Sequence, residues 1–125
     1  MDFDVLTEQV IGAAIEVHKV LGPGLLESAY QQCMKHELGL RGLRYESEVP
    51  VIIDYKGCVV GDAYRMDLLI EDKLVVELKT VSNVSDIHKA QLLTYLKLTK
   101  RRVGLLINFN NVLLVKGISR VVNNY

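Results

Sequence analysis

Two acidic residues and a lysine lie within a short stretch of the chain and are of the types that hold a divalent metal. Asp67 is followed ten residues later by Glu77, and Lys79 comes two residues after Glu77. Carboxylate oxygens are the ligands that Mg²⁺ and Mn²⁺ prefer, and such ions keep bound waters that can meet a substrate phosphate. A lysine beside them can stabilise charge in the transition state. This combination predicts a divalent-metal site that acts on phosphate esters.

The three residues lie on two predicted strands, 58–70 and 74–80, which a turn at 71–73 joins into a hairpin. With a three-residue turn the antiparallel register is fixed, and a slip of one residue would bury charges. The expected apolar face consists of the pairs Ile70–Leu74, Leu68–Val76 and Met66–Leu78. The other face then carries Asp67 directly opposite Glu77.

Two interpretations of this charged face remain open at the level of the hairpin. Opposed Cβ atoms are about 4.5–5.5 Å apart, so two carboxylates there repel each other unless a cation lies between them. That cation could be a metal ion. It could equally be the side chains of Arg65 and Lys79, which the register also places opposite each other, as a ladder of cross-strand ion pairs.

Helices and further strands are predicted on both sides of the hairpin. Apolar residues recur at helical spacing before and after Gly22-Pro23-Gly24, and Asp4 or Thr7 can cap the first of these helices. Asn110-Asn111 is a turn signal between two apolar runs. The predicted helices are 7–21, 25–38 and 86–100, and the remaining predicted strands are 45–54, 103–109 and 112–116, with 118–125 a last strand or a surface segment.

This order, ααβββαββ, predicts a mixed α/β (α+β) domain in which helices flank a mixed sheet, with residues 1–125 forming a single domain. Half of the 125 residues are hydrophobic and 24% are charged, as in a globular chain with a real core. Basic and acidic residues both number 15, so overall charge alone does not favour tight nucleic-acid binding, although a local basic groove remains possible. The densest basic stretch is Lys97, Lys100, Arg101 and Arg102, interpreted as a solvated helix end.

The location of the protein is predicted from what the sequence lacks. The first residues have no basic segment of a signal peptide, and no apolar run approaches the ~20 residues of a membrane span. Cys33 and Cys58 lack metal-ligand spacing and are interpreted as small buried hydrophobic residues in a reducing compartment. We therefore expect a cytoplasmic protein that has no membrane partner.

Four segments resemble the motifs of one nuclease superfamily and together span nearly the whole chain. Asp67 with Glu77-Leu78-Lys79 resembles the PD-(D/E)xK signature, with Met66 in place of the usual proline. Residues 24–30, Gly-Leu-Leu-Glu-Ser-Ala-Tyr, match the GxxExxY motif that names a small bacterial and archaeal family in that superfamily. The remaining matches are residues 91–95, which fit the QxxxY helix motif of the recombination-exonuclease-like branch, and residues 106–110, which resemble the strand that follows in the GxxExxY family.

The resemblance implies a restriction-endonuclease-like core and a nuclease that uses Mg²⁺, or Mn²⁺, to cleave DNA or RNA. In that family Asp67 and Glu77 would bind the metal together with the Leu78 backbone carbonyl. Glu27 would add a third carboxylate, directly or through water. Lys79 would orient the attacking water and stabilise the transition state.

Other residues of the motifs are given supporting roles. Gln91 and Tyr95 are four residues apart, hence on one helical face, and are predicted to line the site, with His88 beside them. Tyr30 is expected to pack beside the site rather than to do chemistry. His18 is interpreted as a structural histidine with its hydrogen bonds satisfied.

Two other functions fit the sequence. One is a catalytically weak or inactive module on a nuclease fold, which binds nucleic acid or a protein partner within a larger complex. The small size, the net charge of zero and the lack of an added recognition domain motivate it. The other is a structural homo-oligomer with a vestigial site. A homodimer also suits a nuclease, because one small domain covers little of a duplex.

Overall fold

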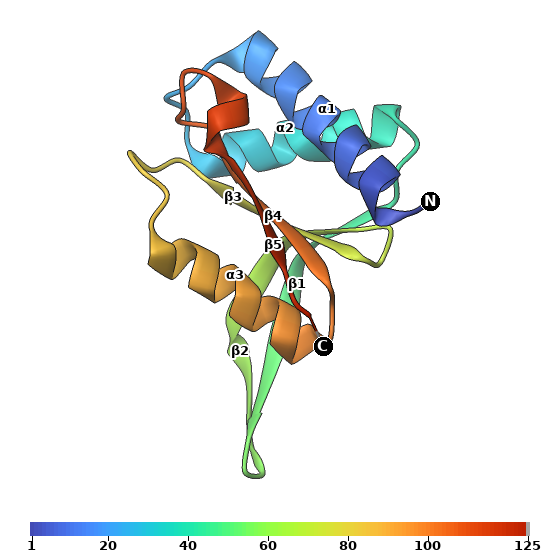
Figure 1. The fold of residues 1–125 in the computed structure, drawn as a ribbon, viewed down its shortest axis with the longest axis vertical. Coiled ribbons are helices and arrows are strands. Elements are labelled where there is room, and N and C mark those ends of the chain that lie inside the picture. The colour runs from blue at the N-terminus through green and yellow to red at the C-terminus, as the bar shows by residue number, and fades with distance from the viewer. Residues whose placement is uncertain (125) are drawn as a thin grey trace.

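The computed structural model describes residues 1–124 and has the mixed α/β architecture that the sequence predicts (Figure 1). Two helices come first, then a three-stranded unit, then a helix and two more strands. The elements are α1 (Phe3–Leu21), α2 (Glu27–Leu40), β1 (Tyr45–Tyr55), β2 (Cys58–Ile70), β3 (Leu74–Lys79), α3 (Asp86–Thr99), β4 (Val103–Asn108), the 3₁₀ helix η1 (Leu114–Gly117) and β5 (Ile118–Val122).

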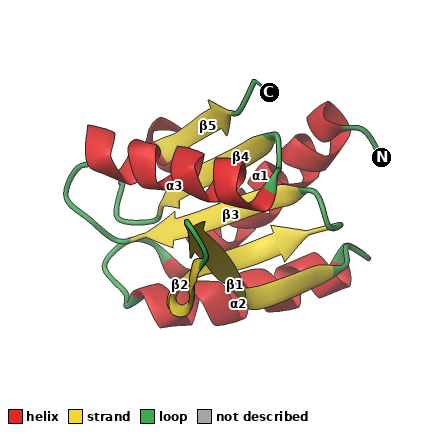
Figure 2. Ribbon diagram, turned by 90° about the horizontal axis from the view of Figure 1, so that it is seen from below, coloured by secondary structure: helices red, strands yellow, loops and turns green. Residues whose placement is uncertain are grey.

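The five strands form one sheet in the order β1-β2-β3-β4-β5. Only β3 and β4 run parallel, and α3 makes the crossover between them, while the other neighbours are antiparallel. Helices α1 and α2 cover one face and α3 covers the other, as Figures 1 and 2 show. Strands β3 and β4 are therefore buried on both sides, which explains their near-continuous apolar sequences.

Side chains of β3 alternate between the two halves of the core. Leu74, Val76 and Leu78 pack with α1 and α2, whereas Val75 packs with α3. Because alternate residues share a face, Glu77 points to the side of Val75 and α3. The face of the sheet opposite α1 and α2 is thus covered by α3, and the candidate acids do not lie on an open sheet surface.

The β1–β2 hairpin projects beyond the body of the molecule (Figure 1). Its register shifts between Val51 and Ile53, and most residues from Tyr55 to Arg65 are exposed. This arm leaves the sheet on the side of α3. None of the helices formed by residues 1–124 has the length and apolar character that a membrane crossing requires.

Two predictions of local secondary structure were wrong, and so was the expected burial of the cysteines, since Cys58 is exposed and Cys33 is half-buried. Helix α1 begins at Phe3, and its cap is Asp2, whose Oδ1 accepts a hydrogen bond from the Val5 N–H at 2.9 Å; Asp4 and Thr7 lie inside the helix. Residues 112–116 do not return as a strand after the Asn110-Asn111 turn. The segment instead crosses to α1 and forms η1, and the strand that pairs with β4 is β5.

Close packing around Asn111 explains the second difference. The backbone oxygen of Asn111 lies 2.8 Å from His18 Nε2, which ties the segment to α1. A Cβ on Gly117 would lie 2.6 Å from Asn111 Oδ1 and 2.7 Å from the Asn108 backbone oxygen, so the chain passes closely under the turn before β5 begins. His18 is thereby confirmed as a structural histidine.

Candidate active site

Asp67 and Glu77 lie side by side, as the hairpin register predicts. The backbone ladder between β2 and β3 comprises Leu68–Val76, Leu69–Val75 and Ile70–Leu74 and ends there. At the next position side chains replace backbone carbonyls. Glu77 Oε2 accepts from the Asp67 N–H at 2.7 Å, and Asp67 Oδ2 accepts from the Leu78 N–H at 2.8 Å.

Met66 departs from the predicted register where the ladder ends. It was expected to share a face with Leu68 and Leu78. It packs instead in the half of the core beneath α3, with Leu69 and Tyr95, while Leu68 and Leu78 face α1 and α2. The two carboxylates occupy the gap that this separation of the strands opens.

The ladder of cross-strand ion pairs is absent from the part of the chain that the structure describes. Arg65 donates to the Glu48 backbone oxygen at 3.5 Å, and neither Arg65 nor Lys79 forms an ion pair with Asp67 or Glu77. The ion pairs in residues 1–124 are Arg41–Glu37, Arg44–Glu71, Arg101–Asp72 and Arg120–Asp4. The negative charge of the acid pair is left without a cation in direct contact.

Both members of the acid pair have a raised pKa. Burial raises the pKa of Glu77 to about 8, and the neighbouring charge of Asp67 adds to the rise. Burial also raises the pKa of Asp67 to about 6, although the hydrogen bond from the Leu78 N–H opposes this. A salt bridge would lower both values. Two buried like charges of this kind are what a bound cation would stabilise.

Lys79 and Glu27 face the same charges from β3 and α2. The Lys79 ammonium lowers the pKa of both Asp67 and Glu77, which places it within electrostatic reach of the pair. Glu27 is the first residue of α2 and is half-buried; burial raises its pKa, and the Lys79 charge partly offsets this rise. The charge of Glu27 in turn raises the pKa of Asp67 and of Glu77, so Glu27 lies within electrostatic reach of the acid pair.

The carboxylates do not form a complete three-ligand cage. Within residues 1–124, no three histidine, cysteine or acidic side chains are grouped closely enough to hold a metal ion. Asp67 Oδ1 and Glu77 Oε1 accept no hydrogen bond from any described residue, so each carboxylate keeps an oxygen for another partner. Two such oxygens suit Mg²⁺, which is bound by one or two carboxylates and keeps several waters.

Tyr30 fixes the turn that positions Glu27. Its hydroxyl donates to the Gly22 backbone oxygen at 2.6 Å and accepts from the Leu25 N–H at 3.2 Å. The ring is fully buried and stacks on Phe109 at 4.4 Å between centroids. Tyr30 thus has the packing role predicted for it, and α2 begins at Glu27, two residues later than predicted, because the chain is held in this turn.

Two residues beside the acids were missed by the sequence analysis. Gln31, one helical turn after Glu27, donates from Nε2 to the Asp67 backbone oxygen at 3.1 Å and to Glu48 Oε1 at 3.1 Å. Glu48 lies in β1 across from Asp67 and has a φ of 53°, which is unusual for a residue other than glycine. Its charge contributes to the raised pKa of Asp67. In the sequence, the signal for Gln31 was its position four residues after Glu27, which places both side chains on one face of the helix.

Tyr95 approaches the acids from α3, and Gln91 lines the same groove beside α3. The pKa of Tyr95 is raised to about 12, mainly by burial and then by the charge of Glu77. Gln91 and Tyr95 line a groove of about 400 Å³ between α3 and the β1–β2 arm. Tyr64 lies in the same groove, its ring 6.1 Å from that of Tyr95. No hydrogen bond joins Gln91 to the acids or to Lys79 in the described structure.

His88 does not join this pair. Its Nδ1 accepts from the Ser85 N–H at 3.1 Å and closes a capping box at the start of α3. The imidazole therefore satisfies an orphan backbone donor, which explains why it turns back to the helix start and not to the acids.

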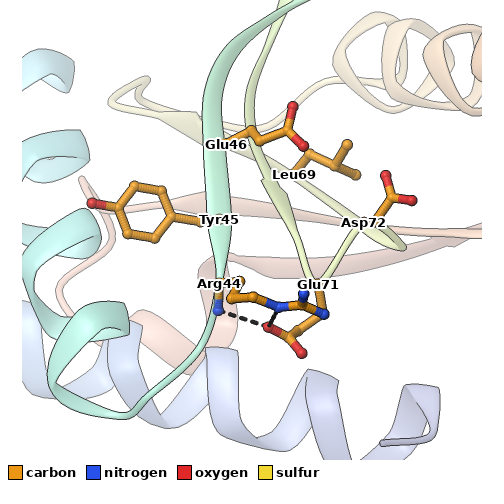
Figure 3. Close-up of a pocket in the computed structure, with 6 residues that line it drawn as sticks. All are labelled: Arg44, Tyr45, Glu46, Leu69, Glu71 and Asp72. Atoms are coloured by element: carbon orange, nitrogen blue, oxygen red, sulfur yellow. Dashed lines mark hydrogen bonds and ion pairs between the residues drawn. The ribbon is translucent and has the colours of Figure 1, made fainter.

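A second pocket, of about 240 Å³, lies at the start of β1 and is shown in Figure 3. Two of its charged residues pair with each other: Glu71 Oε2 accepts from the Arg44 N–H at 2.7 Å and from Arg44 Nε at 3.4 Å. The backbone hydrogen bond lowers the pKa of Glu71. The contact ties β1 to the β2–β3 turn, and the pocket contains no predicted site residue. The acid pair, and not this pocket, is therefore the candidate active site.

Comparisons with known proteins show the family of the chain. The model of the PD-(D/E)XK nuclease superfamily matches residues 4–121. No curated protein matches the chain. A solved structure described as "Crystal structure of SSO0001" is 19% identical, with a TM-score of 0.51 over 96% of this chain and 79% of that chain, a likeness of fold. Because the family model covers the helices, the hairpin and its acids, the chain belongs to the PD-(D/E)XK nuclease superfamily.

Proposed function

We propose that this protein is a metal-dependent nuclease that hydrolyses phosphodiesters of DNA or RNA. The observation that carries the proposal is the acid pair: Asp67 and Glu77 are held together in a buried position, with raised pKa values and no ion-pair partner. Members of the superfamily generally use divalent metals, and the two uncommitted carboxylate oxygens are donors of the right type.

Each residue of the site is assigned a role in that reaction. Asp67 and Glu77, together with the Leu78 carbonyl, would hold Mg²⁺, and Mn²⁺ could replace it; Glu27 would act through a water. The ion supplies positive charge at the phosphate and makes water a better nucleophile at neutral pH. The Lys79 ammonium orients that water and stabilises the charge that develops on the phosphate oxygens.

The bond changes follow from attack by water. The water oxygen forms a bond to phosphorus, the bond from phosphorus to the 3′ oxygen breaks, and the products are a 5′-phosphate and a 3′-hydroxyl. Tyr95 lies within electrostatic reach of Glu77 and would line the site beside that carboxylate. Gln91 lines the same groove and would contact the substrate there.

We further assign the chain to the GxxExxY family within the superfamily and treat residues 1–125 as one nuclease domain. The basis is the segment 24–30, in which Tyr30 fixes the turn and Glu27 faces the acids. This arrangement gives the motif a physical reason: the tyrosine positions the helix whose first residue is the third acid.

Cleavage assays on the purified protein test the proposal. Labelled single- and double-stranded DNA and RNA are incubated with Mg²⁺, Mn²⁺ or EDTA, and products are resolved on gels. Cleavage is expected with either metal and is expected to disappear in EDTA, in Asp67→Asn and in Lys79→Ala. Asp62→Asn, an exposed acid on the β1–β2 arm, is the matched control and should cleave normally. Cleavage that survives Asp67→Asn, or no cleavage with either metal, would contradict the proposal.

A module that binds nucleic acid or a protein partner without cutting is the second candidate. The absence of three grouped metal-binding side chains in residues 1–124 favours it, as does the raised pKa of Glu77, which lets a proton replace a metal between the acids. Glu77→Gln separates the two functions, because the amide retains an acceptor for the Asp67 N–H but carries no charge. Affinity for nucleic acid that survives Glu77→Gln and EDTA, without cleavage in the wild type, supports this candidate.

A further inference from the structure

A polar pocket of about 220 Å³ lies where the parallel strands β3 and β4 end. The carboxyl ends of parallel strands are where open α/β sheets commonly bind ligands. The walls come from three segments that are distant in sequence: the loop after β3, the first turns of α3, and the connection from β4 to β5. The polar residues that line the pocket are Ser82, Asn83, Lys89, Asn111, Lys116 and Ser119.

The charge of this pocket is positive. Lys89 of α3 and Lys116 of η1 line it, and no acidic residue is among the described residues that line it. Neither lysine forms an ion pair or a side-chain hydrogen bond with any residue in 1–124, Asp86 in the first turn of α3 included. Two uncompensated ammonium groups, with hydroxyl and amide donors between them, are complementary to a phosphate anion.

The walls of the pocket are fixed in place by a buried asparagine. Asn108 is fully buried at the end of β4, and its Oδ1 accepts from the Val81 N–H at 3.0 Å. Its Nδ2 donates to the Val81 backbone oxygen at 2.8 Å and to Asn111 Oδ1 at 2.9 Å. The close approach of Gly117 to Asn111 completes this frame. A frame that is already rigid loses little conformational entropy when it binds an anion.

The pocket is near the candidate active site. Lys79 pairs with Asn108 across β3 and β4, and Ser82 follows Lys79 by three residues. Three residues span at most about 11 Å, because an extended chain covers ~3.3–3.6 Å per residue. One strand of duplex DNA advances 3.4 Å per nucleotide along the axis, so Ser82 lies no more than roughly three nucleotides from Lys79.

We propose that this pocket binds a backbone phosphate of the nucleic-acid strand, no more than roughly three nucleotides from the phosphate beside Lys79. Lys89 and Lys116 supply the charge, and Ser82, Asn83 and Ser119 supply neutral donors. The choice of a nucleic acid as the ligand rests on the proposed function. The pocket also explains how a chain of net charge zero holds a polyanion, since positive charge is concentrated where the strand passes.

Salt-dependent binding tests this proposal without requiring cleavage. The affinity for labelled single- and double-stranded oligonucleotides of DNA and of RNA is measured by fluorescence anisotropy in EDTA, over a series of salt concentrations. Each phosphate contact contributes about 0.9 to the slope of log affinity against log salt for duplex DNA, and about 0.7 for single strands. Because both lysines are assigned to one phosphate, the double variant should lower the slope by about one contact, and Lys89→Ala or Lys116→Ala alone should lower it by less.

Lys97→Ala is the matched control, because Lys97 is an exposed lysine of the same helix that does not line the pocket. Its slope should equal that of the wild type. Thermal unfolding of each variant verifies the fold, and the exposed positions of Lys89 and Lys116 make equal midpoints the expected result.

An unchanged slope in the double variant, or no binding of any oligonucleotide by the wild type, overturns the phosphate site. A titration with inorganic phosphate, followed by amide chemical shifts, tests the other source of the anion. Saturable shifts that are lost in the double variant while the oligonucleotide slope stays unchanged would assign the pocket to free phosphate and would also overturn the proposal. Cleavage by the wild type is scored separately, so a phosphate site in an inactive protein contradicts the proposed function alone.

Discussion

The Asp67 N–H donates a hydrogen bond to Glu77 Oε2 at 2.7 Å, and the Leu78 N–H, next to Glu77, donates one to Asp67 Oδ2 at 2.8 Å. Each carboxylate thus replaces a carbonyl of the β2–β3 ladder at the position where the ladder ends. The arrangement holds two like charges together in a buried position without a salt bridge. It also gives Glu77 a structural role that can be separated from its charge.

Substitution of Glu77 tests that separation. Glu77→Ala leaves the Asp67 N–H without an acceptor and opens a gap at a buried position, so we expect a loss of about 1–3 kcal/mol in the free energy of unfolding. Glu77→Gln keeps an acceptor and removes the repulsion with Asp67, so its stability at pH 8 in EDTA should equal or exceed that of the wild type. Urea denaturation measures both. Equal losses in the two variants would show that the charge itself stabilises the fold.

The pH dependence of stability follows from the raised pKa of Glu77. The pKa rises from 4.5 to about 8, chiefly through burial, so the folded protein binds more protons than the unfolded chain between these values. The stabilisation is complete below about pH 4.5 and is lost as pH rises through about 8. We expect the melting temperature in EDTA to fall over this range, and Mg²⁺ to restore it at the upper end.

Glu77→Gln is the control for this pH profile, because the amide does not titrate. Its melting temperature should fall less than that of the wild type between pH 5 and about 8. Asp67 titrates in the same window, with a pKa of about 6, so a residual slope is expected in the variant. Identical profiles in variant and wild type would exclude Glu77 as the group responsible.

The hydrogen bonds of Gln31 connect α2 to β1 and β2 at the acids. Because Gln31 follows Glu27 by one turn, its contacts with Asp67 and Glu48 set how far α2 stands from the acid pair. We expect Gln31→Leu to raise the Mg²⁺ concentration for half-maximal cleavage by roughly 10–100-fold, the usual cost of losing an outer partner of a metal ligand. The maximal rate at saturating Mg²⁺ should change less.

Gln32→Leu is the matched control for Gln31→Leu. Gln32 is the same residue type at the next position of α2, but it is exposed and lines a groove between α1 and α2, away from the acids. Its Mg²⁺ requirement should be that of the wild type. A Gln31→Leu variant whose metal requirement also stays unchanged would rule out the positioning role.

The part of the site within one hairpin was predictable because its register is strongly constrained. Leu68, Leu74 and Val76 can only be buried in one register, and that register brings Asp67 to Glu77. The contacts of Gln31 and Glu48 were not predictable in this way. They depend on how a helix packs across two strands, and residue spacing along the chain does not contain that information.

The segment from β4 to β5 was also not predictable from residue spacing along the chain. The Asn110-Asn111 turn predicts an immediate hairpin, yet β5 begins at Ile118 because Asn111 contacts His18 of α1 and Gly117. This is a tertiary contact overriding local turn chemistry. The lysines of the polar pocket, 89 and 116, likewise lie far apart in the sequence, and only the packing of the connection from β4 to β5 against the loop after β3 brings them together.

The hydroxyl of Tyr30 provides a test of how the site depends on the turn before α2. Tyr30→Phe retains the ring that stacks on Phe109 but removes the bonds to the Gly22 oxygen and the Leu25 N–H. We expect a loss of about 1–3 kcal/mol in unfolding free energy, since a partly buried carbonyl and N–H lose their partner. We also expect cleavage to require a higher Mg²⁺ concentration, because Glu27 begins the helix that this turn holds. Tyr45→Phe, at a half-exposed tyrosine with no side-chain hydrogen bond in the described structure, should change neither quantity. If Tyr30→Phe lowers stability but leaves the Mg²⁺ requirement of cleavage unchanged, the tyrosine supports the fold alone and Glu27 does not depend on the turn.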